Sequence, residues 1–159
     1  MAMTRTKIAQ ANEAGAAGVQ GMLAGTPVLS LDGALPVDYL SPGDRVLTRN
    51  GARRVAQIEV TVVANARIVT ISADTLGVGK PAAPVTISAA MGVLLRDWRA
   101  RAMYGADQVV VPAGRLADGC YVKAATIAEA RFYTLVFDKP AVIYAGGLEL
   151  ACEGVRVRA

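Results

Sequence analysis

Hydrophobic and polar residues alternate along much of this chain, in short segments separated by glycine, proline or charged residues. Alternation with a period of about two is typical of β-strands that bury one face. The pattern predicts strands at residues 45–49, 54–63, 67–72, 85–88, 93–96, 108–112, 120–123, 132–137 and 142–144. Many short strands at this spacing favour an all-β body, such as a sandwich, a barrel or a related fold.

Four segments depart from this alternation. Residues 6–20 carry apolar side chains near helical spacing, which predicts a short helix, although Gly15 and Gly18 lower the helix propensity. The segment around Leu116 favours a single helical turn, and residues 77–84 are expected to form an exposed loop. The last residues, 155–159, are expected to be frayed or to form a short edge strand.

Glycine marks the expected turns between the first strands. Asp32 followed by Gly33, and residues 50–51, which are Asn-Gly, suit two-residue hairpin turns that need a positive φ. Pro42 followed by Gly43 suits a tight turn, because proline presets φ at the second position and glycine accepts a positive φ at the third. These turns predict successive antiparallel hairpins in the first third of the chain.

The composition favours one compact domain. The chain has 159 residues, of which 53% are hydrophobic, and this is enough to bury a sizeable core. Sixteen glycines and an aromatic content of 5% favour short aliphatic strands over long amphipathic helices. The net charge of +4 comes from basic residues that are spread among acidic ones, so nucleic-acid binding is not expected.

The chain carries no sequence signal for export, for a membrane or for a cofactor. No segment approaches the roughly 18 apolar residues of a membrane span, and the start lacks the apolar core of a signal peptide, so we expect a cytoplasmic protein. Cys120 and Cys152 are too few and too far apart for a disulfide framework or a zinc site, and are expected to be reduced and structural. No phosphate-binding, dinucleotide or metal-binding motif occurs, so no cofactor or metal is expected.

Four segments occur in an order that carries a family resemblance. Residues 25–51 read GTPVLSLDGALPVDYLSPGDRVLTRNG, and three shorter segments follow at residues 88–91, 107–116 and 137–149. Together they resemble bacterial Hint domains, the fold shared by Hedgehog autoprocessing domains and inteins. The resemblance implies a β-horseshoe at residues 21–153, preceded by an extension at 1–20 and followed by a tail at 154–159.

The same resemblance identifies three reactive positions at which this chain carries other residues. The family nucleophile, usually the cysteine of Cys-Phe-x-x-Gly-Thr, falls on Gly21. The family histidine of the Thr/Ser-Pro-x-His block falls on Met91, four residues into the block that begins at Ser88, and a later family histidine falls on Pro140. The whole chain contains no histidine. The resemblance therefore predicts a catalytically inactive Hint-like domain that serves as an interaction or scaffolding module.

An alternative is residual self-cleavage or acyl transfer by a substitute nucleophile. Ser88, Cys120 and Cys152 are the candidates, but the sequence places no histidine beside any of them to act as a base. Buried, unreactive thiols and a structural hydroxyl are the simpler readings. A third reading is an unrelated all-β protein that binds a small ligand or a polysaccharide.

A basic and aromatic segment at residues 94–105 is the candidate binding site. It contains the single tryptophan of the chain among arginines, and both residue types often anchor interfaces. The expected partner is another protein or a neighbouring domain, whereas packing of the tryptophan into the core would leave no such site. The residues of this candidate site are Arg96, Trp98, Arg99, Arg101 and Tyr104.

Overall fold

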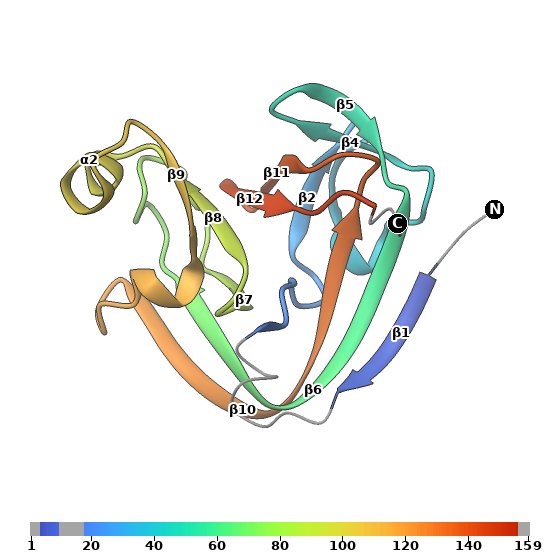
Figure 1. Cartoon of the computed structure of the whole chain (residues 1–159), viewed down its shortest axis with the longest axis horizontal. Coiled ribbons are helices and arrows are strands. Elements are labelled where there is room, and N and C mark those ends of the chain that lie inside the picture. The colour runs from blue at the N-terminus through green and yellow to red at the C-terminus, as the bar shows by residue number, and fades with distance from the viewer. Residues whose placement is uncertain (1–3, 10–17, 156–159) are drawn as a thin grey trace, which may run out of the picture.

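The computed structural model describes residues 4–9 and 18–155, and side chains from residue 18 onward. Its first sheet has four strands: β6 lies between β1 and β10, and β7 also pairs with β6. Figure 1 shows β6 and β10 as two long curved strands that run along the base of the molecule. The bounds of this sheet are β1 (Thr4–Ala9), β6 (Gln57–Ile71), β7 (Val85–Ser88) and β10 (Val122–Val136).

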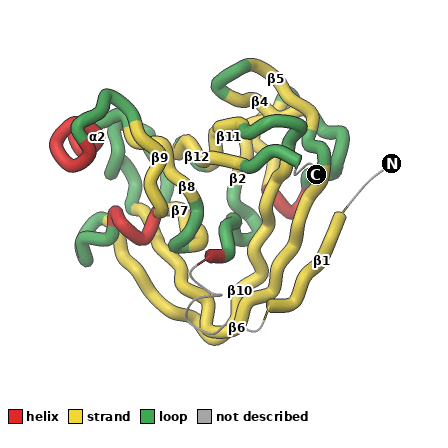
Figure 2. Tube along the Cα trace, in the orientation of Figure 1, coloured by secondary structure: helices red, strands yellow, loops and turns green. Residues whose placement is uncertain are grey.

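The second sheet contains eight short strands in the order β3-β2-β4-β11-β12-β8-β9, with β5 paired to β4. Figure 2 shows that strands and loops make up nearly all of the fold and that the helical segments are short, which confirms the predicted all-β class. The bounds are β2 (Pro27–Ser30), β3 (Gly33–Pro36), η1 (Val37–Tyr39), β4 (Arg45–Thr48), β5 (Gly51–Arg54), β8 (Gly92–Leu95), α2 (Trp98–Tyr104), β9 (Val109–Pro112), η2 (Ala113–Leu116), β11 (Ala141–Ala145) and β12 (Leu148–Cys152).

The two long strands correct the predicted strand boundaries. Residues 54–63 and 67–72 were expected to be separate strands, but 57–71 form the single strand β6, and β10 likewise joins the strands expected at 120–123 and 132–137. Asn65 has a φ of 51° in the middle of β6, and both long strands bend sharply at the base of Figure 1. Asparagine tolerates this left-handed conformation better than most residues. The alanine-rich middle of β10 has low strand propensity, so its strand conformation depends on pairing with β6.

Two hairpins share one turn geometry, which places the turn one residue earlier than predicted. In the β2–β3 hairpin Ser30 pairs with Gly33, so the two turn residues are 31 and 32, and Gly33 follows them with a φ of 95°. The Ser30 hydroxyl donates a hydrogen bond of 2.7 Å to the Gly33 carbonyl and accepts one of 3.1 Å from the Asp32 amide. The β4–β5 hairpin repeats the arrangement at Thr48 and Gly51.

The helix predicted at residues 6–20 is wrong for its first part. Residues 4–9 form strand β1, which pairs in parallel with β6, from Thr4 opposite Ile58 to Ala9 opposite Val63. The sequence TRTKIA alternates with a period of two, which is the signal for a strand. Residues 10–17 lie outside the described part of the chain.

Two other predicted local structures are confirmed. Residues 113–116 form the short helical turn η2, and residues 77–84 form a loop. Of the tail, Val155 donates a backbone hydrogen bond of 2.7 Å to Phe137, and the remaining residues are not described. No helix in the described ranges is long and apolar enough to cross a membrane.

The main core contains residues of both sheets. Aliphatic residues fill most of it, and a smaller second cluster contains Val63, Ala66, Ala130 and Phe132.

Candidate functional site

The segment around Gly21 lies between β7 and β10 and pairs with both strands. Met22 forms bridges with Ile87 of β7 and with Tyr133 of β10. The Met22 amide donates to the Tyr133 carbonyl at 2.9 Å, and the Tyr133 amide donates to the Met22 carbonyl at 2.8 Å. The Ser88 amide donates to the Gly21 carbonyl at 3.0 Å. The Gly21–Met22 peptide unit is therefore hydrogen-bonded on both sides, by β7 through its carbonyl and by β10 through its amide.

Gly21 lies where no side chain fits. Its φ is 153°, a value that L-residues rarely adopt. A Cβ atom added at this position would lie 2.6 Å from the Cβ atom of Phe132 and 3.1 Å from the Oγ1 atom of Thr134. Contacts below 3.0 Å require the neighbouring atoms to move. A residue with a side chain at position 21, where the resemblance puts the nucleophile, would therefore be strained.

Two hydroxyl groups contact the chain just before Gly21. The Ser88 hydroxyl donates a hydrogen bond to the Val19 carbonyl and accepts one of 3.1 Å from the Ala90 amide. The Thr134 hydroxyl donates to the Gln20 carbonyl at 2.8 Å. Sequence analysis missed Thr134, because only the register of β10 shows that its side chain reaches residue 20.

Met91 and Pro140, the other two positions to which the resemblance points, have different surroundings. Met91 is buried next to Ser88, since its amide donates to the Ser88 carbonyl at 3.0 Å. Pro140 lines a separate pocket of about 120 Å³ together with Thr48, Asn50 and other residues, none of which is Gly21, Ser88 or Met91. The structure thus brings Gly21, Ser88 and Met91 together and leaves Pro140 apart.

The two cysteines have opposite environments. Cys152 is buried, and this burial together with the charge of Glu153 raises the pKa of its thiol to about 12, so it carries almost no thiolate near neutral pH. Cys120 is exposed, which corrects the expectation that it is a buried core residue. It follows a turn in which the Asp118 carboxylate accepts hydrogen bonds from the amides of residues 120, 121 and 122. These bonds hold the pKa of Asp118 below its ordinary value.

The arginines of the predicted binding segment have carboxylate partners within the molecule, whereas its tryptophan is exposed. Trp98 begins helix α2 and has 67% of its surface exposed, and the Arg99 guanidinium lies 4.9 Å from the centre of its ring. Arg99 also pairs with Asp97, and Arg101 pairs with Asp107. Tyr104 is half-buried and packs against the main core. Of the five predicted residues, Trp98 and Arg101 are exposed on α2, whereas the Arg99 side chain is only 15% exposed.

Arg96 belongs to a different group, which is centred on a buried carboxylate. Its guanidinium donates to both carboxylate oxygens of Glu149, at 2.8 and 2.9 Å, and Arg49 donates to the same carboxylate at 2.9 Å. Glu149 is only 7% exposed. Burial by itself raises the pKa of Glu149. The hydrogen bonds and charges of Arg96 and Arg49 together lower the pKa by more than burial raises it, so the net shift is downward. The hydrogen bond to Glu149 likewise raises the pKa of Arg96.

The described residues contain no cluster of metal-binding side chains. Across 18–155, no three histidine, cysteine, aspartate or glutamate side chains are grouped so that they could hold a metal ion. The groups that hydrogen-bond to residues 19–22 are hydroxyls and backbone amides and carbonyls, which donate or accept hydrogen bonds without titrating near neutral pH.

Comparison with known proteins identifies the fold and the family. The bacterial intein-like domain from Clostridium thermocellum matches with a TM-score of 0.64 at 15% identity, over 85% of this chain and 99% of that one. The gp41-1 intein matches with a TM-score of 0.54 at 14% identity, over 83% and 98%, and the MchDnaB-1 intein with 0.55 at 15%, also over 83% and 98%. No curated protein sequence matches. A family profile for the Hint domain matches residues 21–155, and the chain therefore belongs to the Hint domain family.

Proposed function

We propose that this chain is a Hint domain that does not process its own backbone and that serves as a binding module for another protein or a neighbouring domain. The observation that carries the first half is the geometry of Gly21, at the position where the resemblance puts the nucleophile. A Cβ atom there would lie 2.6 Å from Phe132, so the position is fitted to glycine. Nucleophilic attack on the preceding carbonyl needs a side chain that this backbone excludes.

The pairing of β1 supports the same proposal. In the self-cleaving reading, residues before Gly21 would be separated from the domain. Residues 4–9 instead form a strand of the domain's own sheet, in register with residues 58–63 of β6. A segment that completes the sheet is one that the domain retains, because its release would expose the backbone groups of β6 that it pairs.

Intact mass spectrometry tests whether the backbone is processed. The purified protein is incubated for days with dithiothreitol, with hydroxylamine or with neither, since these nucleophiles cleave a thioester or an ester. We expect one unchanged mass in every condition, and the same result for Gly21→Cys, because the introduced side chain does not fit the backbone. A break between Gln20 and Gly21 that depends on hydroxylamine would contradict the proposal.

The alternative of residual autoprocessing rests on one observation, the hydrogen bond of 2.8 Å from the Thr134 hydroxyl to the Gln20 carbonyl. In that reaction the Thr134 oxygen would attack the Gln20 carbonyl carbon, and the amide nitrogen of Gly21 would leave with the proton as an amine. Glu59 lies opposite Thr134 in the β6–β10 ladder and is the candidate for a base. Thr134→Val removes the hydroxyl, so a cleavage that persists in this variant would exclude Thr134 as the nucleophile.

The exposed apolar side chains of α2 support the proposal that the domain binds another protein or domain. Trp98 and Met103 expose 67% and 55% of their surface on one short helix, beside the paired arginines 99 and 101. An exposed tryptophan that is stacked by a guanidinium is a preorganised anchor for a protein interface.

A pull-down with matched variants tests this surface. We expect proteins retained by the wild-type domain to be lost with Trp98→Ala and kept with Tyr39→Ala, which removes another aromatic residue, 75% exposed, from a different surface. Equal retention by the Trp98→Ala and wild-type domains would contradict a binding role for α2.

A further inference from the structure

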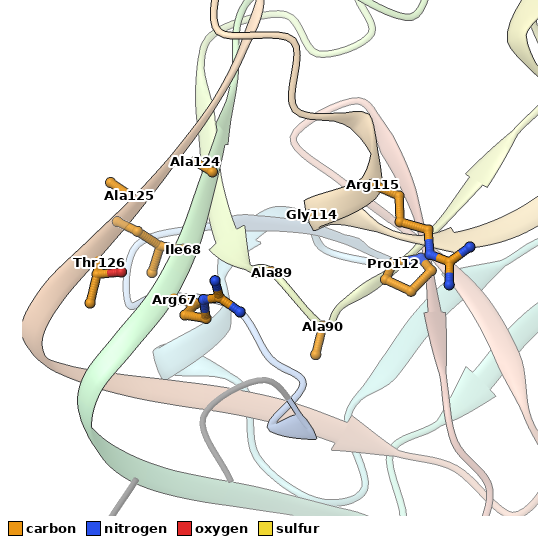
Figure 3. A pocket seen from close by; sticks show the side chains of 10 residues that line it. All are labelled: Arg67, Ile68, Ala89, Ala90, Pro112, Gly114, Arg115, Ala124, Ala125 and Thr126. Carbon is orange, nitrogen blue, oxygen red and sulfur yellow. The ribbon is translucent and has the colours of Figure 1, made fainter. Parts of the chain in front are cut away.

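A pocket of about 540 Å³ lies where β6, β10 and η2 meet the turn after β7. Figure 3 shows this pocket with the Ala90 side chain between the guanidinium groups of Arg67 and Arg115. The volume lies within the range of about 300–1,000 Å³ that is usual for small-molecule sites. The pocket is lined by Arg67, Ile68, Ala89, Ala90, Pro112, Gly114, Arg115, Ala124, Ala125 and Thr126.

The charge of the pocket wall has one sign. Arg67 and Arg115 are the charged members of the lining, which contains no carboxylate. In the described part of the chain neither guanidinium forms an ion pair or a hydrogen bond to an acidic side chain, whereas Arg49, Arg96, Arg99 and Arg101 each pair with a carboxylate of this molecule. Two cations that share a concave surface without an internal counter-ion favour an anionic ligand.

The remaining wall is small, apolar and held in place. The Ala89 amide donates to the Arg67 carbonyl at 3.0 Å, and the Gly114 amide donates to the Ala89 carbonyl at 2.8 Å, so β6 and η2 fix the turn between them. A Cβ atom at Gly114 would lie 3.3 Å from the Ala89 carbonyl oxygen, which shows how closely these segments pack. The four lining alanines leave open the space that larger side chains would fill.

We propose that this pocket binds a small organic anion, in which a phosphate or carboxylate group is attached to a compact apolar body. The planar guanidinium groups of Arg67 and Arg115 would pair with the oxygens of the anion, since arginine matches both oxyanions bidentately. Ile68, Pro112 and the alanines would contact the apolar body. The pocket contains neither Gly21 nor Trp98, so this site goes beyond the proposed function and its test is independent of backbone processing.

Backbone amide NMR tests the proposal with three probes of similar shape. Phenyl phosphate and benzoate carry the two candidate head groups, and benzamide is the neutral control. We expect saturable shift changes at residues 89, 90, 124, 125 and 126 with at least one of the two anions, and binding at least about tenfold weaker with benzamide, because a charge-assisted hydrogen bond is lost. The anion that binds more tightly identifies the head group.

Three variants assign the binding to the pocket. The double variant Arg67→Gln, Arg115→Gln should weaken anion binding at least about tenfold, and Ala90→Leu should block it sterically while keeping both arginines. Arg131→Gln changes the charge of an exposed residue of β10 that does not line the pocket, and should leave binding unchanged. Shift changes that scatter over the surface, equal binding of benzamide, or unchanged binding in the double variant would each overturn the proposal.

Discussion

The buried groups around Gly21 and those around Glu149 connect distant segments in different ways. At Gly21 the chain is held by backbone amides and by the hydroxyls of Ser88 and Thr134, all of them neutral. At Glu149 a carboxylate of β12 is held by two guanidiniums, from the β4–β5 turn and from the residue after β8. Both groups lie between strands that are far apart in sequence, but only the second contains charge.

The two groups therefore affect the protein differently. The group around Gly21 orients the backbone, and the group around Glu149 makes stability depend on pH. The groups that hydrogen-bond around Gly21 are hydroxyls and backbone groups that do not titrate near pH 7, so they orient the chain by neutral hydrogen bonds alone. The charged group has two nearby cations that keep its carboxylate ionised, and so it contributes pH-dependent stability. The ion pairs of Glu149 and the neutral contacts around Gly21 therefore involve different residues of this Hint domain.

The largest expected effect on stability comes from the close packing at Gly21. Gly21→Ala should lower the free energy of unfolding by about 3 kcal/mol, because it combines an unfavourable φ with overpacking against Phe132. Chemical denaturation measures the loss. Gly33→Ala is the control, because Gly33 also has a positive φ but no atom within 4 Å of its added Cβ. Equal losses for the two variants would show that the close contact at Gly21 has no energetic effect.

The next largest effect on stability is expected when the charge of Glu149 is removed. Glu149→Gln keeps the shape but weakens the hydrogen bonds from both arginines, so we expect the free energy of unfolding to fall by about 2 kcal/mol. The control is Asp107→Asn, because its pair with Arg101 is exposed and should contribute little. If Glu149→Gln proves no more destabilising than Asp107→Asn, then Glu149 does not stabilise the fold through its charge.

The pH dependence of stability gives a related prediction. Because the pKa of Glu149 is lower in the folded protein than its ordinary value of 4.5, its ionised form contributes stability above that value. The contribution should be lost as the pH falls through the lowered folded pKa. We therefore expect the difference between wild type and Glu149→Gln to shrink below pH 4.5 in denaturation measured across pH. A constant difference would contradict the assigned shift.

The smallest expected effect on stability comes from the Thr134 hydroxyl, which contacts residue 20. Thr134→Val removes the hydrogen bond to the Gln20 carbonyl with little change in shape, and should cost about 1 kcal/mol of unfolding free energy. Thr126→Val is the matched control on the exposed half of the same strand. Thermal denaturation compares the two, and an equal change in both would mean that Thr134 does not hold residue 20.

The sequence predicted the parts of the fold that depend on local chemistry. The all-β class follows from alternation, and the hairpins follow from glycine, although hydrogen bonds from Ser30 and Thr48 set each turn one residue early. The continuity of β6 and β10 was not predicted, because Asn65 and the alanines around it carry no strong strand signal. Pairing between the two strands supplies what local propensity lacks.

The candidate site was predicted in part. The resemblance located Gly21, Ser88 and Met91 together, but it gave no sign that Pro140 lies elsewhere or that Thr134 contacts residue 20. The arginines at 96 and 99 gave the same signal in sequence, yet one pairs with Glu149 in the core and the other stacks on Trp98. The carboxylate partner of Arg96 lies 53 positions away in the sequence, and that of Arg49 lies 100 positions away, beyond any local pattern.

The contrast between the two cysteines provides an internal reporter of unfolding. Cys120 is exposed and should react with a thiol reagent in the native state, whereas Cys152 reacts only when the core around β12 opens. The labelling rate of the second thiol relative to the first would therefore measure the free energy of opening in the unmodified chain, with no introduced probe.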